Sequence, residues 1–255
     1  RAELGLDKPV LVQYVNYMWD ILHGDFGVSW FTKQPVIDEI VNRMPYTLSL
    51  GVLSTLIASI ISIPLGTLTA VKHNTPADYI VTFLCLLFAA MPGFWLAIIL
   101  QIYLSLQTGW FPAYGMGTMR HFVLPVIAVC AASVATNIRS TRTWVLDVIR
   151  SDYVRTARAK GASEVVVIMK HALRNALLPI VTGFGSAFAG VLGGSVVIET
   201  VFAIPGISTY LTSAVKTRDM PIIMGCILVI SVFVGVVNLL VDLMYSVIDP
   251  RVKYE

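Results

Sequence analysis

Charged residues are scarce in this chain. Asp, Glu, Lys and Arg make up 13% of its 255 residues, whereas 56% are hydrophobic, and the mean hydropathy is +0.78. Because soluble globular domains carry about 25% charged residues, this composition excludes an ordinary soluble domain. It indicates a membrane protein.

Cysteine is scarce too. Cys85, Cys130 and Cys226 lie inside long apolar runs and show no paired spacing, so they indicate neither a zinc site nor a redox motif. The four His residues are scattered along the chain and form no ligand cluster. We therefore expect no metal site, and we interpret the cysteines as small buried hydrophobic residues.

Signatures of catalysis are missing. The chain contains no GxxxxGK[ST] sequence, so any ATP hydrolysis linked to it would belong to another subunit. It has no HExxH motif and no paired acids within its apolar runs, which an intramembrane enzyme would need. We expect this chain not to be an enzyme. A secondary transporter or channel, the alternative from a different class, would be expected to carry internal repeats or acidic groups at mid-depth, and the sequence shows neither.

What the sequence does contain is long apolar runs. A membrane-spanning helix needs about 20 consecutive apolar residues. Five runs of this kind lack Asp, Glu, Lys and Arg: Tyr46 to Val71, Tyr79 to Leu106, His121 to Ile138, Asn175 to Ile198, and Met220 to Val241. The third extends to about Trp144, and the last continues past Asp242 to Ile248. They predict an all-α polytopic membrane protein with a transmembrane domain over 46–248.

The distribution of Lys and Arg predicts the orientation, because cytoplasmic loops carry the excess of these residues. Eight of them lie between Arg139 and Arg174, whereas the connection 107–120 has one and the connection 200–219 has two. This places segment 1–45 outside the cytoplasm and tail 249–255 inside it. The net charge of +3 is explained by membrane topology and needs no nucleic-acid partner. Since five spans is an odd count and the chain begins at Arg1, we expect one more span upstream.

The segment before the first run contains apolar residues at helical spacing. These are Val10, Tyr14, Tyr17, Met18 and Ile21. The spacing predicts an amphipathic helix that lies outside the membrane or against its surface. The alternative is a short packed helix without a partner.

The stretch Arg155 to Pro179 is unusually polar for this chain. Its pattern predicts a helix from Tyr153 to Lys160, capped by Ser151 or Asp152 and ended by Gly161 in the left-handed conformation. Ser163 is placed to cap a second helix that runs towards Asn175. The small residues at the bend would let the surface of another protein come close to the backbone. A basic hairpin above anionic lipid is the alternative from composition alone.

This stretch also carries a resemblance. The sequence DYVRTARAKG at 152–161, followed by HALRNALLP at 171–179, resembles the coupling loop of permease subunits of binding-protein-dependent ABC importers, in the dipeptide, oligopeptide and nickel permease family. Arg155, Thr156 and Ala157 occupy the family's Glu-Ala-Ala triplet, and Gly161 occupies its glycine, so the triplet's Glu is absent. Further segments that resemble the same family are HGDFGVS at 23–29, IETVFAIPGI at 198–207, NLLVDLMY at 238–245 and DPR at 249–251.

The resemblance implies a fold, partners and a substrate class. It implies the type I importer permease fold in a bacterial inner membrane, a second homologous permease, two cytoplasmic ATPases and an extracytoplasmic solute-binding protein. ATP and Mg would be held by the ATPases, so no cofactor is expected in this chain. Peptides are the expected substrate, and nickel or a nickel chelate is the alternative. The implied coupling loop spans 146–176 and docks through Arg155, Thr156, Ala157, Arg158, Ala159, Lys160, Gly161, Ala162 and Ser163.

Ionisable residues at the span ends are candidates for function by their rarity. Glu199 precedes the Pro205–Gly206 turn, and we expect it to cap or brace this loop rather than to contact substrate. Asp242 lies near the cytoplasmic end of the last run, at the same expected depth as Arg139 and Arg142. An ion pair between Asp242 and one of these arginines is the simplest interpretation.

Overall fold

The computed structural model describes residues 8–248 and is helical almost throughout. Its long helices are α2 (Val36–Val71), α3 (Pro76–Ala90), α5 (Arg120–Ile149), α8 (Arg174–Gly194) and α11 (Met220–Ile248). Shorter elements are α1 (Val10–Leu22), α4 (Gly93–Leu100), η2 (Gln101–Gln107), α6 (Asp152–Ala159), α7 (Glu164–Val166), η3 (Val167–Leu173), α9 (Val196–Val201) and α10 (Ile207–Thr217). The predicted tail 249–255 lies outside the described residues.

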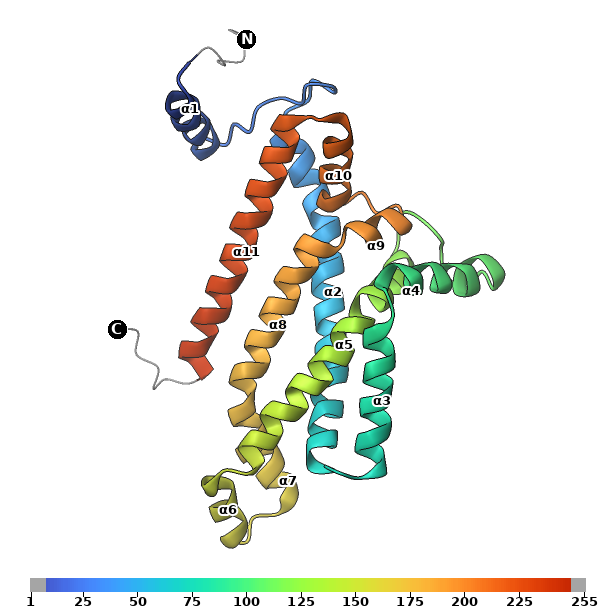
Figure 1. Ribbon diagram of the computed structural model, residues 1–255, viewed down its shortest axis with the longest axis vertical. Coiled ribbons are helices and arrows are strands. Elements are labelled where there is room, and N and C mark those ends of the chain that lie inside the picture. Colours follow the sequence, from blue (N-terminus) through green and yellow to red (C-terminus); the bar gives the residue numbers. More distant parts are fainter. Residues whose placement is uncertain (1–7, 249–255) are drawn as a thin grey trace.

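The long helices run side by side along the length of the molecule (Figure 1). The connection through α6 and α7 lies at one end of this bundle, and α9 and α10 lie towards the other (Figure 1). We call these the α6 end and the α10 end. Within the described residues, four helical segments are long and apolar enough to cross a membrane, or five if the bent pair α3 and α4–η2 counts as one span.

The run Tyr79–Leu106, expected as one span, forms this bent pair of helices. α3 stops at Ala90, and the helix that resumes at Gly93 is turned by 93°. Pro92 explains the break, because its ring disfavours helical backbone angles at the preceding residue, and Met91 accordingly has φ −80° and ψ 125°.

The fourth expected span is also revised. α7, η3 and α8 form one continuous segment, Glu164–Gly194, so the second helix of the polar loop is the beginning of the membrane helix. Segment 163–178 contains no Gly or Pro that would interrupt it. α8 ends at Gly194 rather than at Ile198, since Gly193, Gly194 and Ser195 have low helix propensity, and α9 begins directly afterwards.

The helix expected near the N-terminus is present as α1, and all of its residues are exposed or half-buried. α2 begins at Val36 instead of Tyr46, so it includes a polar first turn with Asp38 and Glu39. Acidic residues stabilise the N-terminal turn of a helix through its dipole, which favours this earlier start.

Candidate functional site: the α6 loop and its connections to the bundle

The turn after α6 is a Schellman motif. Gly161 has a φ of 83°, in the left-handed region that glycine adopts without steric cost. Its N–H donates to the Arg158 carbonyl at 2.9 Å, and the Ala162 N–H donates to the Ala157 carbonyl at 3.3 Å. These are the two hydrogen bonds that define the motif, and they satisfy carbonyls that the end of a helix leaves free. The prediction that Gly161 ends this helix in a left-handed conformation is confirmed.

The two loop helices begin where the sequence predicts, but the expected side-chain capping hydrogen bonds are not formed. Ser151 and Ser163 are the N-cap residues of α6 and α7, but neither side chain accepts the capping hydrogen bond. The Ser151 hydroxyl donates instead to the Val148 carbonyl at 2.6 Å. The hydroxyl thus ties the start of α6 to the last turn of α5.

One buried side chain holds α6 against the bundle. Val154 is completely buried, although its neighbours along α6 are exposed or half-buried. Of the residues expected to form the docking surface, Ala157 and Ala162 are half-buried, while Arg155, Thr156, Arg158, Ala159, Lys160, Gly161 and Ser163 are exposed. A β-carbon added to Gly161 would meet no atom within 4 Å, so the outer side of the turn is open.

An ion pair crosses the turn. Arg158 Nε donates to Glu164 Oε1 at 2.8 Å, and Arg158 Nη2 donates to Glu164 Oε2 at 3.3 Å. The Arg158 side chain is 39% exposed and that of Glu164 is 61% exposed. Arg155 lies 3.8 Å from Asp152 in a pair that is more exposed still. Pairs in such contact with water contribute little to stability.

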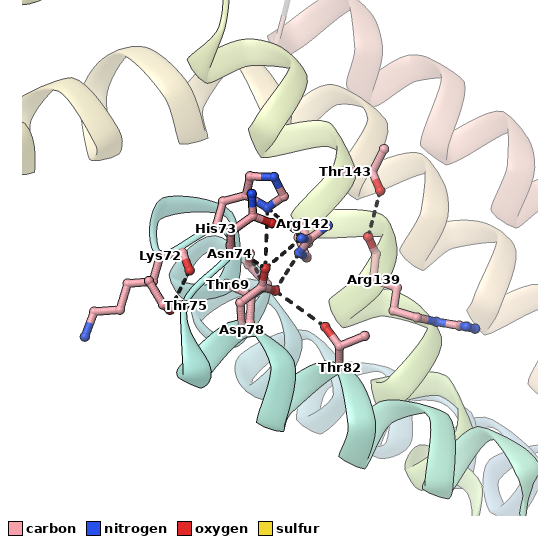
Figure 2. Close-up of polar contacts among 11 residues, drawn as sticks. Thr69, Lys72, His73, Asn74, Thr75, Asp78, Thr82, Arg139, Arg142 and Thr143 are labelled. Atoms are coloured by element: carbon pink, nitrogen blue, oxygen red, sulfur yellow. Dashed lines mark hydrogen bonds and ion pairs between the residues drawn. The ribbon is translucent and has the colours of Figure 1, made fainter.

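A second charged cluster lies where the α2–α3 turn meets α5 (Figure 2). Arg142 donates from Nε to Asp78 Oδ1 at 2.8 Å and from Nη2 to Asp78 Oδ2 at 2.7 Å. The same carboxylate accepts the Asn74 N–H at 3.0 Å. Asp78 is only 2% exposed, so its charge depends on these donors.

His73 completes the cluster. Arg142 Nη2 lies 2.8 Å from His73 Nδ1 (Figure 2). The same ring nitrogen lies 3.4 Å from Asp78 Oδ2, so His73 contacts both members of the pair. The cluster therefore joins the α2–α3 turn to the helix that leads directly into α6.

Arg142, one of the two arginines expected to pair with Asp242, binds another carboxylate. This carboxylate is that of Asp78, in the first turn of α3, and a pair between Asp242 and Arg139 stays a prediction. Arg139 is exposed, and its side chain points away from Asp78 in Figure 2. Asp242 occupies an exposed position on α11. Depth in the membrane did not distinguish Arg139 from Arg142, whereas the directions of their side chains do, since only Arg142 points towards Asp78.

Glu199 lies far from this cluster, at the α10 end, and is completely buried. Its carboxylate accepts hydrogen bonds from the Thr47 hydroxyl at 2.9 Å, the Ser195 hydroxyl at 2.8 Å and the Thr209 N–H at 3.0 Å. The Thr47 hydroxyl also accepts the Ile207 N–H at 2.9 Å. Ile207 and Thr209 are in the first turn of α10, whose N-cap is Gly206. The carboxylate and Thr47 thus replace the side-chain cap that glycine lacks.

Sequence reasoning missed Asp78, His73 and Thr47. Asp78 carried a usable signal, since it is the only acidic residue of the short turn between the first two apolar runs. Thr47 carried none, because a hydroxyl within an apolar run is equally compatible with a bond to its own helix.

The arrangement defines a class of protein. A bundle of long apolar helices has the short polar helix α6 at one end and the capped first turn of α10 at the other. The same fold is found in solved ABC transporters: the MetNI methionine ABC transporter has a chain that matches 82% of this one and 96% of its own length, with a TM-score of 0.71 and 16% identity. A chain of an amino acid ABC transporter crystallised with histidines matches 84% of this chain and 94% of its own length, with a TM-score of 0.61 and 16% identity.

The sequence comparisons identify the family. Residues 62–254 match the model for the binding-protein-dependent transport system inner membrane component, and residues 1–51 match the model for the N-terminal part of such membrane components. The chain belongs to this family, and it is a membrane-embedded permease of a binding-protein-dependent ABC importer. The family is one of transport permeases rather than enzymes, which also decides against a secondary transporter or channel.

Relatives match all or nearly all of the chain. The oligopeptide transport system permease protein AppB of Bacillus subtilis is 41% identical over 98% of this chain and 83% of its own length. The dipeptide transport system permease protein DppB of Escherichia coli K12 is 36% identical over 100% of this chain and 84% of its own length. The DppB protein of Alkalihalophilus pseudofirmus is 38% identical over 100% of this chain and 85% of its own length.

Proposed function

We propose that this chain and a second, homologous permease form the path by which di- or oligopeptides cross the inner membrane. The names of its relatives support the substrate class, since AppB and the two DppB proteins are named for oligopeptide and dipeptide transport. None of these three names favours nickel. A solute-binding protein on the α10 side would deliver the peptide, and two ATPases on the α6 side would drive its passage.

The observation that carries the mechanism is the Schellman turn at Gly161, seated on the bundle by Val154. An ATPase transmits force only through contacts that differ between its open and closed states. The permease therefore needs a lever that moves as a rigid body, and α6 has the required features. Both of its ends are tied by hydrogen bonds, one buried side chain anchors it, and its outer surface is polar with small residues at the bend.

The connection from this lever to the bundle is direct in the structure. α6 follows α5 after Arg150 and Ser151, and the segment after the turn runs without a break into α8. The Asp78–Arg142 pair fixes α5 to the α2–α3 turn. A displacement of α6 would thus reach α5 and α8 together, and through Asp78 it would also reach α2 and α3.

Uptake in a deletion strain tests this function. The strain lacks this chain but retains the neighbouring transport genes, and it receives the wild-type chain, an empty vector or Gly161→Val. We expect the wild-type chain alone to restore uptake of a labelled di- or oligopeptide. Labelled nickel is measured in parallel. Restored nickel uptake without peptide uptake would replace the proposed substrate by the metal.

Reporter fusions test the orientation. A reporter that works only in the cytoplasm should be active when it is fused after Lys160. A reporter that works only outside the cytoplasm should be active when it is fused at Gly115, near the α10 end. Reversal at either point would contradict the placement of the ATPases at the α6 end.

A further inference from the structure

The helix formed by α4 and η2 exposes its apolar face and buries its polar residues. From Phe94 to Leu106 its exposed residues are apolar or aromatic: Phe94, Trp95, Ile98, Ile102, Tyr103 and Leu106. Within this helix only the last residue, Gln107, is both polar and exposed. Its inward face carries the polar residues Gln101 and Ser105, each 8% exposed, together with the fully buried Ala97. A helix at a water-facing surface shows the opposite distribution.

The inward face is fixed to the α10 end of the molecule. Gln101 Nε2 donates to the Ala113 carbonyl at 2.9 Å and to the Val201 carbonyl, at the end of α9, at 3.3 Å. In Figure 1, α4 accordingly extends sideways from the bundle at the level of α9. The Gln101 side chain is the long polar side chain on the inward face of this helix. Its two hydrogen bonds fix the direction of the helix relative to α9.

The length of α3 sets the depth at which this helix lies. α3 has 15 residues, so it rises about 22 Å, whereas the hydrocarbon core of a bilayer is about 30 Å thick. Asp78, in the first turn of α3, belongs to the charged cluster at the opposite end of α3. With that cluster at one membrane surface, the bend at Met91–Pro92 falls inside the opposite edge of the hydrocarbon, where an exposed polar side chain would be costly.

We propose that α4–η2 does not complete a membrane span but lies parallel to the membrane plane, with its exposed face against lipid at the α10 side. The apolar exposed surface of α3, which includes Phe83 and Leu87, continues into this face without an intervening charge. Trp95 and Tyr103 have the amphipathic rings that concentrate near the lipid headgroups. The rim of a protein interface would carry polar residues, and the exposed residues of α4–η2 from Phe94 to Leu106 carry no charge.

The depth of spin labels tests this placement. Single cysteines at Phe94, Ile98, Ile102 and Leu106 are labelled with a nitroxide in the complete transporter, reconstituted in phosphatidylethanolamine–phosphatidylglycerol nanodiscs. The native Cys85, Cys130 and Cys226 are buried, so the unsubstituted chain serves as the labelling control. Collision rates with oxygen, which is soluble in lipid, and with chromium oxalate, which is soluble in water, give the depth of each label. Phe83→Cys and Leu87→Cys on α3 are the matched spanning controls.

We expect the four labels on α4–η2 to collide mainly with oxygen and to lie at depths within about 5 Å of one another, well below the helix diameter of about 10–12 Å. In a straight span the same twelve-residue interval would cover about 18 Å. A depth difference near that larger value would overturn the proposal. So would a dominance of chromium oxalate, which indicates water, or protection from both reagents while the α3 labels remain accessible, which indicates a protein partner.

Discussion

Two arginines near the α6 end are bound by carboxylates through the same two-pronged geometry, but in opposite surroundings. Arg142 binds Asp78, which is 2% exposed and 64 residues away in the sequence. Arg158 binds Glu164, whose side chain is 61% exposed and which is six residues away. The Nε hydrogen bond is 2.8 Å long in both pairs, so this distance alone does not distinguish them.

Burial does distinguish them, because a charge removed from water depends on its partner and an exposed charge retains its hydration. The Asp78–Arg142 pair is therefore a structural joint between helices. The Arg158–Glu164 pair lies across a turn that backbone hydrogen bonds already hold. We conclude that the shape of the α6 loop depends on the glycine turn and on the buried Val154, and that the exposed charges around the turn contribute little to it.

The largest expected effect is at the joint. Asp78→Ala would leave the Arg142 guanidinium without its carboxylate. Because the Arg142 side chain is 25% exposed, the expected cost is below the roughly 3–5 kcal/mol of a fully buried pair but above that of an exposed pair. We expect a sharp fall in the amount of folded permease, measured as the fraction that survives heating in detergent. Asp147→Ala removes an exposed carboxylate from the same end and should change this fraction little.

The double variant Asp78→Ala/Arg142→Ala makes this prediction sharper. It removes both charges, so part of the lost stability should return relative to Asp78→Ala alone. Strictly additive losses in the double-mutant cycle would show that the two side chains are not coupled, and the joint would then have to be abandoned.

An intermediate effect is expected at the anchor of the lever. Val154→Ala removes two carbons from a completely buried side chain, which costs about 1.5 kcal/mol from lost burial, with a further contribution from any cavity. Val165→Ala, at a position that is 70% exposed, is the matched control. Hydrogen exchange of the α6 amides should accelerate in the first variant only. Equal exchange in both would mean that Val154 does not hold α6.

The smallest effect is expected at the exposed pair. Arg158→Ala and Glu164→Ala should each change the free energy of unfolding by less than about 1 kcal/mol, and salt should reduce their coupling further. A double-mutant cycle of Arg158→Ala and Glu164→Ala measures this coupling. A coupling as large as that of Asp78 with Arg142 would remove the distinction between the two pairs.

The sequence predicted the features that depend on local chemistry. Gly161 ends α6 because few residues other than glycine fit that backbone angle, and this requirement can be read from residues 152–163 alone. Long apolar runs likewise predicted the helices that cross the membrane. The orientation and the ATPase contact remain predictions.

Features that depend on contacts between distant segments were less predictable. The bend at Pro92 lies inside an uninterrupted apolar run, and proline within such a run is compatible with either a kink or a continuous helix, as Pro45 and Pro64 inside α2 show. The carboxylate that Arg142 binds was not predicted, for a related reason. Membrane topology gives the depth of a charge but not the face of the helix on which it lies.

The most direct test of the account is co-purification of the ATPase subunits with Gly161 variants. A left-handed backbone costs a residue with a side chain roughly 1–2 kcal/mol, and a side chain at the bend would stand on the open face of the turn. We therefore predict that Gly161→Val enters the membrane but loses both its ATPases and peptide uptake, that Gly161→Asn, which tolerates this backbone, retains more of both, and that Arg155→Ala retains nearly all. Retention of the ATPases by Gly161→Val, together with their loss from Arg155→Ala, would show that the loop binds through its charges and would contradict the central claim.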